Sequence, residues 1–234
     1  MKKKVLITGG NKGIGLEVSK MMLDLGYKII VAGRDFSTFP LKQNDDIKLV
    51  EVDLSDLNNL PRFISEVGDI DILINNAGFM QPKYTYDNYP EIAKTKIMNV
   101  DLYAPVELIN AFSKNMKKNK FGRIVNTASI AGQIGHPDVW YGIAKAGLIN
   151  ATKIYAKLLG ADGITVNCVA PSAAETDMQK DNEEARKKAF KAAVVTNRFA
   201  EPEEVAKAIV WLATDCPEYI NGITIDINNT FYPR

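Results

Sequence analysis

The sequence predicts an α/β fold: a single domain with a doubly wound, mostly parallel sheet of about seven strands flanked by helices. Two observations predict it. Short apolar runs rich in Val and Ile alternate along the chain with longer amphipathic segments, which is typical of strand–helix–strand units with right-handed crossovers. The length of 234 residues suits one sizeable domain. We therefore expect one domain covering residues 1–234.

Each element follows from the local pattern of apolar residues. Continuous apolar runs, as in strands buried on both faces, predict strands at residues 4–8, 28–32, 47–52, 70–75, 123–128, 165–169 and 223–227. Apolar residues at helical spacing predict helices at residues 13–25, 57–67, about 90–117, 139–159 and 202–213.

Two segments interrupt this alternation. Residues 36–46 include Pro40 and are mostly polar, which predicts a loop where a helix would otherwise connect two strands. Residues 177–196 are charged and helix-prone, so they predict a surface helix. Because this segment follows a strand whose end faces the expected ligand crevice, it is also a candidate lid over the substrate.

Composition excludes several classes of protein. A net charge of +1 provides no basic field for nucleic acid and no acidic excess of the kind that favours disorder. Cys168 and Cys216 lack metal-type spacing, and the chain has one histidine, so we expect thiols in a reducing compartment and no metal site. The apolar run after Lys2–Lys4 is too short for a signal core or a membrane span. We therefore expect a cytoplasmic protein without a membrane partner.

A glycine-rich loop joins the first predicted strand to the first predicted helix. Gly9, Gly13 and Gly15 permit a tight turn and let backbone amides approach a pyrophosphate, while the helix N-terminus adds partial positive charge. Its place between strand and helix favours a dinucleotide site of the Rossmann type over an ordinary glycine turn. No Gly-Lys-Ser/Thr follows, which disfavours a nucleoside triphosphate loop.

Four ordered motifs resemble those of the short-chain dehydrogenase/reductase family, and the resemblance runs from about residue 3 to residue 230. Residues 8–15 resemble the family's TGxxxGxG loop, and Asn75-Asn76-Ala77-Gly78 resembles its NNAG element. The four residues that match its Asn-Ser-Tyr-Lys tetrad are Asn99, Ser129, Tyr141 and Lys145. Residues 198–206 are similar to a late helix start in the 3-oxoacyl-(acyl-carrier-protein) reductase-like group.

The spacing of Tyr141 and Lys145 suits proton transfer. The two residues are four apart on a predicted helix, so their side chains share a face. A tyrosine pKa of about 10 is too high for proton exchange at neutral pH, and a nearby ammonium lowers it. We therefore expect Tyr141 to be the acid or base and Lys145 to adjust its pKa.

The resemblance adds roles for the other tetrad residues. It implies that Lys145 also binds the nicotinamide ribose, that Ser129 holds the substrate oxygen, and that Asn99 anchors a water that relays protons to Lys145. Taken singly, these residues have ordinary structural interpretations as surface, turn or capping residues. Their combination with the glycine loop favours the catalytic interpretation. The interval from Ser129 to Tyr141 is one residue shorter than is usual in the family, a change that the intervening loop can absorb.

The end of the second predicted strand bears on the choice of cofactor. An NAD site usually carries an acidic residue there, whereas this chain has Gly33 followed by Arg34, with Lys12 in the glycine loop. These features favour NADP(H), and Asp35 leaves NAD(H) as the alternative. The remaining cofactor contacts implied by the glycine loop and the resemblance are Asn11, Ile14, Asp53, Leu54, Asn76, Ala77, Gly78, Pro171 and Thr176.

Departures from the family pattern lie on the substrate side. Ser172 stands where a glycine is usual, so we expect that loop to be placed differently. Residues 228–230 replace Asp-Gly-Gly in a region that often contributes to subunit contacts in the family, so the homo-oligomer that the resemblance implies is either a dimer or a tetramer. The mixed apolar residues expected around the pocket favour a small or acyl-chain carbonyl: Phe79, Met80, Gln133, Ile134, His136, Trp140 and the Met178 region. His136 is interpreted as a rim or structural residue.

The sequence thus predicts an NADP(H)-dependent oxidoreductase that interconverts a carbonyl and an alcohol, with a 3-oxoacyl thioester as one candidate substrate. A sugar, polyol or small-alcohol dehydrogenase is the alternative within the same class. A non-catalytic dinucleotide sensor or scaffold is the alternative from another class, because a fold does not fix a function.

Overall fold

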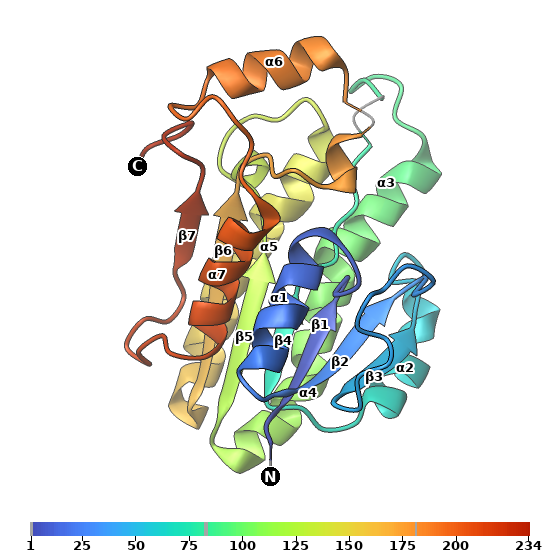
Figure 1. Cartoon of the computed structure of the whole chain (residues 1–234), viewed down its shortest axis with the longest axis vertical. Helices are drawn as coiled ribbons and strands as arrows, with labels where there is room; N and C mark the ends of the chain where they lie inside the picture. Colours follow the sequence, from blue (N-terminus) through green and yellow to red (C-terminus); the bar gives the residue numbers. More distant parts are fainter. Residues whose placement is uncertain (1, 82–83, 181) are drawn as a thin grey trace.

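The computed structural model describes residues 2–81, 84–180 and 182–234. Its centre is a seven-stranded sheet in the order β3-β2-β1-β4-β5-β6-β7, with every neighbouring pair parallel (Figure 1). The expected doubly wound fold is therefore confirmed, and the sheet is parallel throughout. The strands are β1 (Lys4–Thr8), β2 (Lys28–Gly33), β3 (Ile47–Glu51), β4 (Ile72–Asn75), β5 (Gly122–Thr127), β6 (Ile164–Pro171) and β7 (Thr224–Ile227).

Helices cover both faces of the sheet (Figure 1). On one face, α1 (Gly13–Asp24) packs against α7 (Pro202–Ala213). The other face carries α2 (Leu60–Val67), α4 (Ala104–Asn119) and α5 (Val139–Leu159), while α3 (Glu91–Met98) leads into α4 and contacts α5. Helix α6 (Glu184–Ala192) lies beyond the carboxyl ends of the strands. Short 3₁₀ turns occur at Leu57–Asn59 (η1), Ile130–Gly132 (η3), Gly160–Asp162 (η4) and Asp177–Gln179 (η5).

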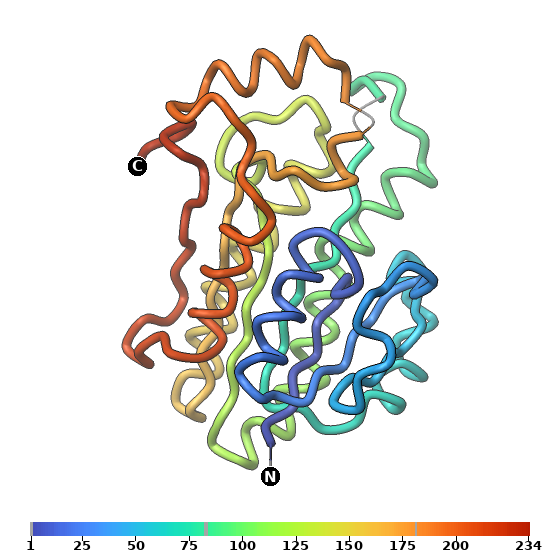
Figure 2. The backbone as a smooth tube through the Cα atoms, viewed as in Figure 1, coloured from blue at the N-terminus to red at the C-terminus, as the bar shows by residue number. Residues whose placement is uncertain are grey.

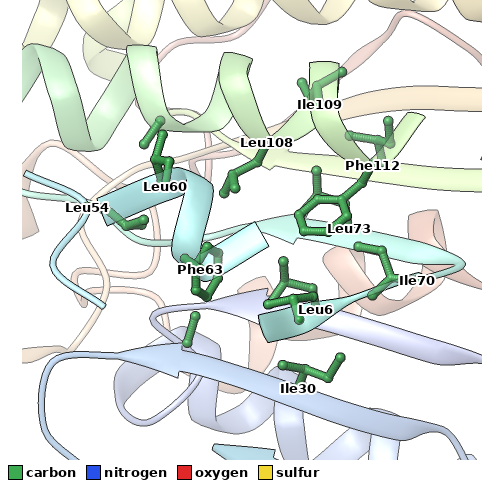
Figure 3. Close-up of a cluster of buried hydrophobic side chains, with 14 of the residues drawn as sticks. Leu6, Ile30, Leu54, Leu60, Phe63, Ile70, Leu73, Leu108, Ile109 and Phe112 are labelled. Carbon is green, nitrogen blue, oxygen red and sulfur yellow. The ribbon is translucent and has the colours of Figure 1, made fainter. Parts of the chain in front are cut away.

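The alternation of side chains along β1 divides the core into two layers. Leu6 faces the cluster under α2 and α4, where Phe63, Leu73 and Leu108 surround it (Figure 3). The neighbouring Val5 and Ile7 face the cluster under α1 and α7. Successive residues of a strand point to opposite faces, so one apolar run serves both layers.

The winding of the sheet reverses between β1 and β4. Thr8 pairs with Ala32 of β2 on one side, and Ile7 pairs with Ile74 of β4 on the other. Ligands of doubly wound sheets bind at the carboxyl ends of the strands at such a point. The glycine loop that follows β1 and the Asn75–Gly78 segment that ends β4 meet there.

The helix predicted at about 90–117 is interrupted. It consists of α3, a π-helical turn η2 (Asn99–Tyr103) and α4. Pro105 has no N–H, so the carbonyl of Asp101 loses its usual helical donor. The chain responds with a wider turn, in which the N–H of Ala104 reaches back five residues to the carbonyl of Asn99.

The two segments that interrupt the sequence pattern behave largely as predicted. Residues 36–46 contain no helix or strand and form the loop that follows β2 in Figure 2. Phe39 in this loop is buried in the core under α1, an anchor that the polar composition did not suggest. Residues 177–196 include η5 and α6, and α6 has no buried residue. Among the described residues, no helix has the length and apolar character needed to cross a membrane.

Candidate active site

The glycine loop at the end of β1 has the shape of a cradle. Gly9 and Gly13 have φ angles of 64° and 53°, which side chains rarely tolerate. A Cβ atom at Gly15 would lie 2.1 Å from the carbonyl oxygen of Gly9 and 2.6 Å from Nδ2 of Asn76. The backbone is therefore packed too closely for any residue but glycine, and the loop leads directly into the N-terminus of α1.

Hydrogen bonds from the end of β4 hold this loop in place. The hydroxyl of Thr8 accepts the N–H groups of Asn76 and Ala77 at 3.0 and 3.1 Å. In return, Nδ2 of Asn76 donates to the carbonyls of Thr8 and Gly9 at 3.1 and 3.3 Å. The structure thus brings Asn76 and Ala77, two of the predicted cofactor contacts, against the glycine loop, and Thr8 is the residue that joins the two segments.

Helix α5 presents Tyr141 and Lys145 on one buried face. Tyr141 is 7% exposed and Lys145 is 2% exposed. The ammonium of Lys145 lies 5.6 Å from the centre of the Tyr141 ring. Nζ also donates to the carbonyl of Thr127, at the end of β5, at 2.9 Å. Asp138 caps the helix by accepting the N–H of Tyr141, which fixes the turn that carries the phenol.

Ser129 completes the group from the end of β5. Its side chain caps η3 by accepting the N–H of Ala131 at 3.1 Å. Burial raises the pKa of Tyr141, and a hydrogen bond with Ser129 partly opposes that rise. The structure therefore brings together three of the four predicted tetrad residues.

Asn99, the fourth, points elsewhere. Its Nδ2 donates to the carbonyl of Ser55 at 2.7 Å, next to the end of β3. The side chain beside Lys145 belongs to Asp101, whose Oδ1 lies 2.9 Å from Nζ. Residues two apart on a helix point in roughly opposite directions, so only one of this pair can face Lys145. The prediction that paired Asn99 with Lys145 is therefore not supported by the contacts, and Asp101 occupies that place.

Asp101 is a fully buried carboxylate. It has no solvent exposure, and its oxygens accept the N–H of Phe79 at 3.1 and 3.3 Å. Burial raises the pKa of Asp101 to about 6, although Lys145 opposes the shift. Burial also lowers the pKa of Lys145, but the charges of Asp101 and Tyr141 more than compensate, so that pKa is raised. Asp101 and Lys145 therefore form an ion pair at neutral pH.

The pKa of Tyr141 differs from the expectation. Burial raises this pKa, Lys145 lowers it, and Asp101 raises it again, with a net upward shift. The prediction that Lys145 brings the Tyr141 pKa below its usual value is therefore wrong for the protein alone. The ammonium acts in the expected direction, but desolvation of the phenolate is the larger effect.

The end of β2 carries the residues on which the predicted choice of cofactor depends. A Cβ atom at Gly33 would lie 3.0 Å from Oδ1 of Asn11, so a larger side chain there would require the Asn11 side chain to shift. Asn11 donates to the carbonyl of Asp35 at 2.7 Å. The carboxylate of Asp35 binds the N–H and hydroxyl of Ser37, and these bonds lower its pKa. Arg34 is exposed and lies close to Asp53. Burial raises the pKa of Asp53, but hydrogen bonds from Ser55 and the charge of Arg34 outweigh that effect, so the pKa is lowered.

Four other predicted cofactor contacts lie in two places: Asp53 and Leu54 follow β3, whereas Lys12 and Thr176 lie at the glycine loop. Leu54 is buried in the core cluster with Leu60, whereas Asp53 is exposed and accepts the N–H of Ser55. Thr176 lies against the glycine loop, 3.2 Å from where a Cβ of Gly13 would be. Lys12 faces the same segment, with its ammonium 3.5 Å from Asp177.

A cavity of about 440 Å³ connects these parts. Its lining joins Ile14, Asn76 and Gly78 on the cofactor side to Ser129, Tyr141 and Lys145, and it also includes Pro171, Thr176, Met80, Ile134 and Met178. Ser172 follows Pro171 without a positive φ and donates its N–H to Ile227, so the loop needs no glycine there.

His136 lies at the substrate side of this cavity. Its ring centre is 5.6 Å from that of Tyr141, and its Nε2 is 3.3 Å from the guanidinium of Arg186 on α6. Burial and Arg186 lower the pKa of His136, so the ring is neutral at pH 7. These contacts suit the rim role that the sequence predicts.

Comparison with known proteins identifies the family. The chain matches the family described as enoyl-(acyl carrier protein) reductase over residues 9–229. It is 32% identical to the 3-oxoacyl-(acyl-carrier-protein) reductase FabG of Haemophilus influenzae, over 98% of both chains. The chain belongs to the short-chain dehydrogenase/reductase family. The resemblance predicted from the sequence is thus confirmed.

Further relatives agree with this assignment. The chain is 33% identical to an acetoacetyl-CoA reductase of Rhizobium meliloti, over 99% of both chains. A solved short-chain dehydrogenase/reductase family protein superimposes with a TM-score of 0.90 at 29% identity, covering 98% of this chain and 97% of its own. A 4-hydroxyisoleucine dehydrogenase complexed with NADH has a TM-score of 0.92 at 25% identity, with 99% coverage of both. This short-chain dehydrogenase/reductase is an enzyme of the class that interconverts alcohols and carbonyls with a nicotinamide dinucleotide.

Proposed function

We propose that this enzyme is an NADP(H)-dependent carbonyl reductase in which Tyr141 gives the proton and 3-oxoacyl thioesters are the substrate class. One observation carries the proposal: a single cavity joins Ser129, Tyr141 and Lys145 to the glycine loop. The reacting groups and the cofactor cradle are therefore neighbours, as hydride and proton transfer to one carbonyl require.

The residues around the glycine loop fit a dinucleotide. The first turn of α1 offers backbone N–H groups that lack partners within the helix, and glycine at position 15 lets the backbone pack against Gly9 without a side chain between a pyrophosphate and those groups. Gly33, Arg34 and Lys12 favour a 2′-phosphate, which supports NADP(H) over NAD(H). Thr176 and Pro171 would hold the nicotinamide end, and Asn11, Ile14, Asp53, Leu54, Asn76, Ala77 and Gly78 would line the rest of the site. When bound, the reduced cofactor supplies the hydride.

The proton chemistry belongs to the chain itself. Ser129 donates a hydrogen bond to the substrate oxygen and stabilises the negative charge that develops there. As the carbonyl carbon gains a hydride, the O–H bond of Tyr141 breaks and its proton passes to that oxygen, which gives the alcohol. Lys145 stabilises the resulting phenolate. Because burial raises the pKa of Tyr141, the phenol is protonated and ready to donate at neutral pH.

The relatives guide the choice of substrate. Two of them are named as reductases of a 3-oxoacyl carrier-protein thioester and of acetoacetyl-CoA. The cavity agrees with an acyl chain, because the aromatic residues Phe190, Phe199 and Phe231 form part of its wall. Phe190 stacks on Phe231 with ring centres 4.7 Å apart, so α6 contributes directly to this wall. We therefore propose that residues 177–196 act as a lid over the acyl chain.

The outer face of α5 supports self-association. Ile143, Ile154 and Leu158 lie along one side of the helix and are 47%, 47% and 63% exposed. Apolar side chains grouped in this way favour contact with a second protein surface. We propose a homo-oligomer that covers this face, and light scattering during size-exclusion chromatography measures its mass.

Replacing Tyr141 by Phe tests the function. We expect NADPH-driven reduction of acetoacetyl-CoA to fall by at least about a thousandfold, because the proton donor is lost, while NADPH binding by fluorescence titration stays within a few-fold. Tyr155→Phe on the same helix is the matched control, since that hydroxyl donates to Asn110 at the surface. Full activity in Tyr141→Phe would refute the mechanism. Wild-type activity on sugars alone would instead refute the thioester class.

A further inference from the structure

Asp101 is the buried charge that the proton transfer described above does not use. Its carboxylate is withdrawn from solvent between two partners, Lys145 at 2.9 Å and the N–H of Phe79 at 3.1 Å. Gly78 lies on the same side, and a Cβ atom there would be 3.2 Å from Oδ1 of Asp101. The carboxylate is thus fitted closely between the end of β4 and α5. A buried carboxylate is costly unless it is paired, so its position beside the site calls for an explanation.

The negative charge of Asp101 distinguishes it from a neutral acceptor at the same position, which could also accept a hydrogen bond from Lys145. An ammonium has three donors, and Lys145 uses two of them on Asp101 and the Thr127 carbonyl. The third remains for the cofactor ribose or for Tyr141. A neutral amide at position 101 would offer an acceptor to Lys145 without changing the charge of the group. The carboxylate makes the group of Tyr141, Lys145 and Asp101 neutral overall while the phenol is protonated.

The surrounding titratable groups leave this charge balance in place. Asp138, at the start of α5, accepts hydrogen bonds from the Gln81 N–H, the Tyr89 hydroxyl and the Tyr141 N–H. Burial and the Asp138 hydrogen bond raise the pKa of Tyr89, so its phenol is uncharged. On β6, burial raises the pKa of Cys168 to about 11, so its thiol is uncharged too. Asp101 is therefore the carboxylate in contact with Lys145, whereas Asp138 acts on Tyr141 from the start of the helix.

We propose that Asp101 is a positioning residue that holds Lys145 as an ammonium and keeps Tyr141 in its protonated form, so that the site favours carbonyl reduction and oxidises alcohols efficiently only at alkaline pH. Loss of the phenol proton adds a second negative charge near Asp101 in a medium that screens charges poorly. Without the carboxylate, the same step would neutralise a group of charge +1. The direction of the reaction rests on the proposed function, whereas the ionisation of Tyr141 does not.

The ionisation is measured on the protein alone, without cofactor or substrate. Tyrosine phenolate absorbance is followed against pH, and the spectrum of Tyr141→Phe is subtracted to isolate Tyr141. The same subtraction is made in Asp101→Asn, which keeps an acceptor for Lys145. We expect the Tyr141 phenolate to form roughly one pH unit lower in Asp101→Asn. Glu107→Gln is the matched control, because it removes a charge from the exposed face of α4. With Tyr141→Phe subtracted in the same background, so that the effect of Glu107 on Tyr155 cancels, it should leave the Tyr141 titration unchanged.

Turnover provides a second, independent measurement. In Asp101→Asn, the rising limb of the pH profile for 3-hydroxybutyryl-CoA oxidation by NADP⁺ should move roughly one pH unit lower. Reduction of acetoacetyl-CoA by NADPH at pH 7 should change only a few-fold, because the phenol is protonated in both proteins. A purely structural role would weaken both directions and leave the limb in place. If neither thioester reacts with the wild type, the proposed substrate class fails, and the phenolate titration still decides the role of Asp101.

A second neutral variant, Asp101→Ser, guards against a specific defect of the amide. It should shift the phenolate titration in the same direction as Asp101→Asn. An unchanged titration in either folded variant would overturn the proposal. Loss of folding in both variants, seen by circular dichroism, would show that Asp101 serves the fold alone and would overturn it as well.

Discussion

The carboxylate of Asp101 and the ammonium of Lys145 lie 2.9 Å apart in the interior of the enzyme, on η2 and α5. The two residues are 44 positions apart in the chain, so their contact joins the interrupted helix to the helix that carries Tyr141. Among the described residues, the ammonium of Lys145 therefore has two oxygen partners before any cofactor binds, the carboxylate of Asp101 and the carbonyl of Thr127.

Breaking this pair should destabilise the fold. We expect Lys145→Met to lower the free energy of unfolding at pH 7 by about 3 kcal/mol, because it leaves a buried carboxylate unpaired. The double variant Asp101→Asn/Lys145→Met should recover a substantial part of the loss, since no charge then remains buried. Urea unfolding of the wild type, both single variants and the double variant measures the coupling. Strict additivity of the two changes would contradict the pairing.

The same variant has a predictable pH dependence. Burial raises the pKa of Asp101 to about 6, above its usual 3.8, although Lys145 opposes this rise, so the pKa should be higher still in Lys145→Met. A raised acid pKa contributes stability that is fully present below the usual pKa and is lost as the pH rises through the folded value. The deficit of Lys145→Met should therefore shrink between pH 7 and pH 5. A deficit that grows on acidification would show that Asp101 is not the charge responsible.

Gly15→Ala should abolish cofactor binding. The added Cβ would lie 2.1 Å from the backbone oxygen of Gly9, which cannot move without deforming the cradle. We expect NADPH binding, measured by fluorescence titration, to weaken by at least about a hundredfold. Gly160→Ala is the control, because Gly160 has a helical φ of −58° and its nearest outside neighbour is the side-chain nitrogen of Asn221 at 3.3 Å. Equal NADPH affinities in the two variants would refute the assignment of the loop.

Arg34→Ala tests the choice of cofactor. If Arg34 binds the 2′-phosphate, its loss removes a charge-assisted contact and should lower kcat/KM for NADPH by roughly tenfold or more. The value for NADH should stay within a few-fold, because NADH has no phosphate there. Lys28→Ala removes a cation from the opposite end of the same strand and serves as the control. A parallel loss with both cofactors would indicate that Arg34 supports the loop and does not select NADP(H).

Much of this architecture is predictable because several local signals coincide. The helix at Pro202–Ala213 begins and ends where the sequence predicts, since Pro202 suits the first turn and Glu201 and Glu204 form a capping box ahead of an apolar face. The helix at Val139–Leu159 likewise has the predicted bounds, with Asp138 as its cap. β1 has the predicted bounds, and the other strands differ from prediction by one or two residues at one or both ends, where pairing and not composition sets the limit.

The error at Asn99 has a physical cause. The motif match placed an asparagine there, but a motif carries no information about which side of a helix turns inward. The apolar stripe of α4 does carry that information: Ala104, Pro105, Leu108 and Ile109 lie at three, four, seven and eight residues after Asp101. Counted from Asn99, the same spacings reach Leu102, Tyr103, Val106 and Glu107, a mixed set. Periodicity therefore indicates Asp101 as the inward residue.

The upward shift of the Tyr141 pKa cannot be predicted from the sequence, because its largest causes depend on tertiary packing. The four-residue spacing shows that Lys145 is near, and that contribution has the predicted sign. Burial and Asp101 act in the opposite direction, and both depend on tertiary packing that brings η2 and β5 against α5. The balance among desolvation, an ammonium and a carboxylate requires their positions in space.

The ion pair that starts α7 yields a pH-dependent stability. The guanidinium of Arg198 donates to both carboxylate oxygens of Glu204 at 2.7 and 2.8 Å, and the N–H of Glu201 donates to Glu204 at 2.8 Å. These bonds, with Arg198 first, lower the pKa of Glu204 from 4.5 to about 2. A lowered acid pKa contributes stability that is present above the usual pKa and is lost as the pH falls through the folded value.

Glu204→Gln should therefore destabilise the enzyme at neutral pH and much less in acid. The side chain of Glu204 is 44% exposed, so solvent screening limits the loss at pH 7 to about 0.5–1 kcal/mol. The difference in urea unfolding free energy between wild type and Glu204→Gln should fall by more than half between pH 6 and pH 3. Glu203→Gln on the same helical turn is the control, because Glu203 has only the exposed Lys207 as its partner among the ion pairs of the described chain. A pH-independent loss in Glu204→Gln would show that Glu204 acts through packing and not through its charge.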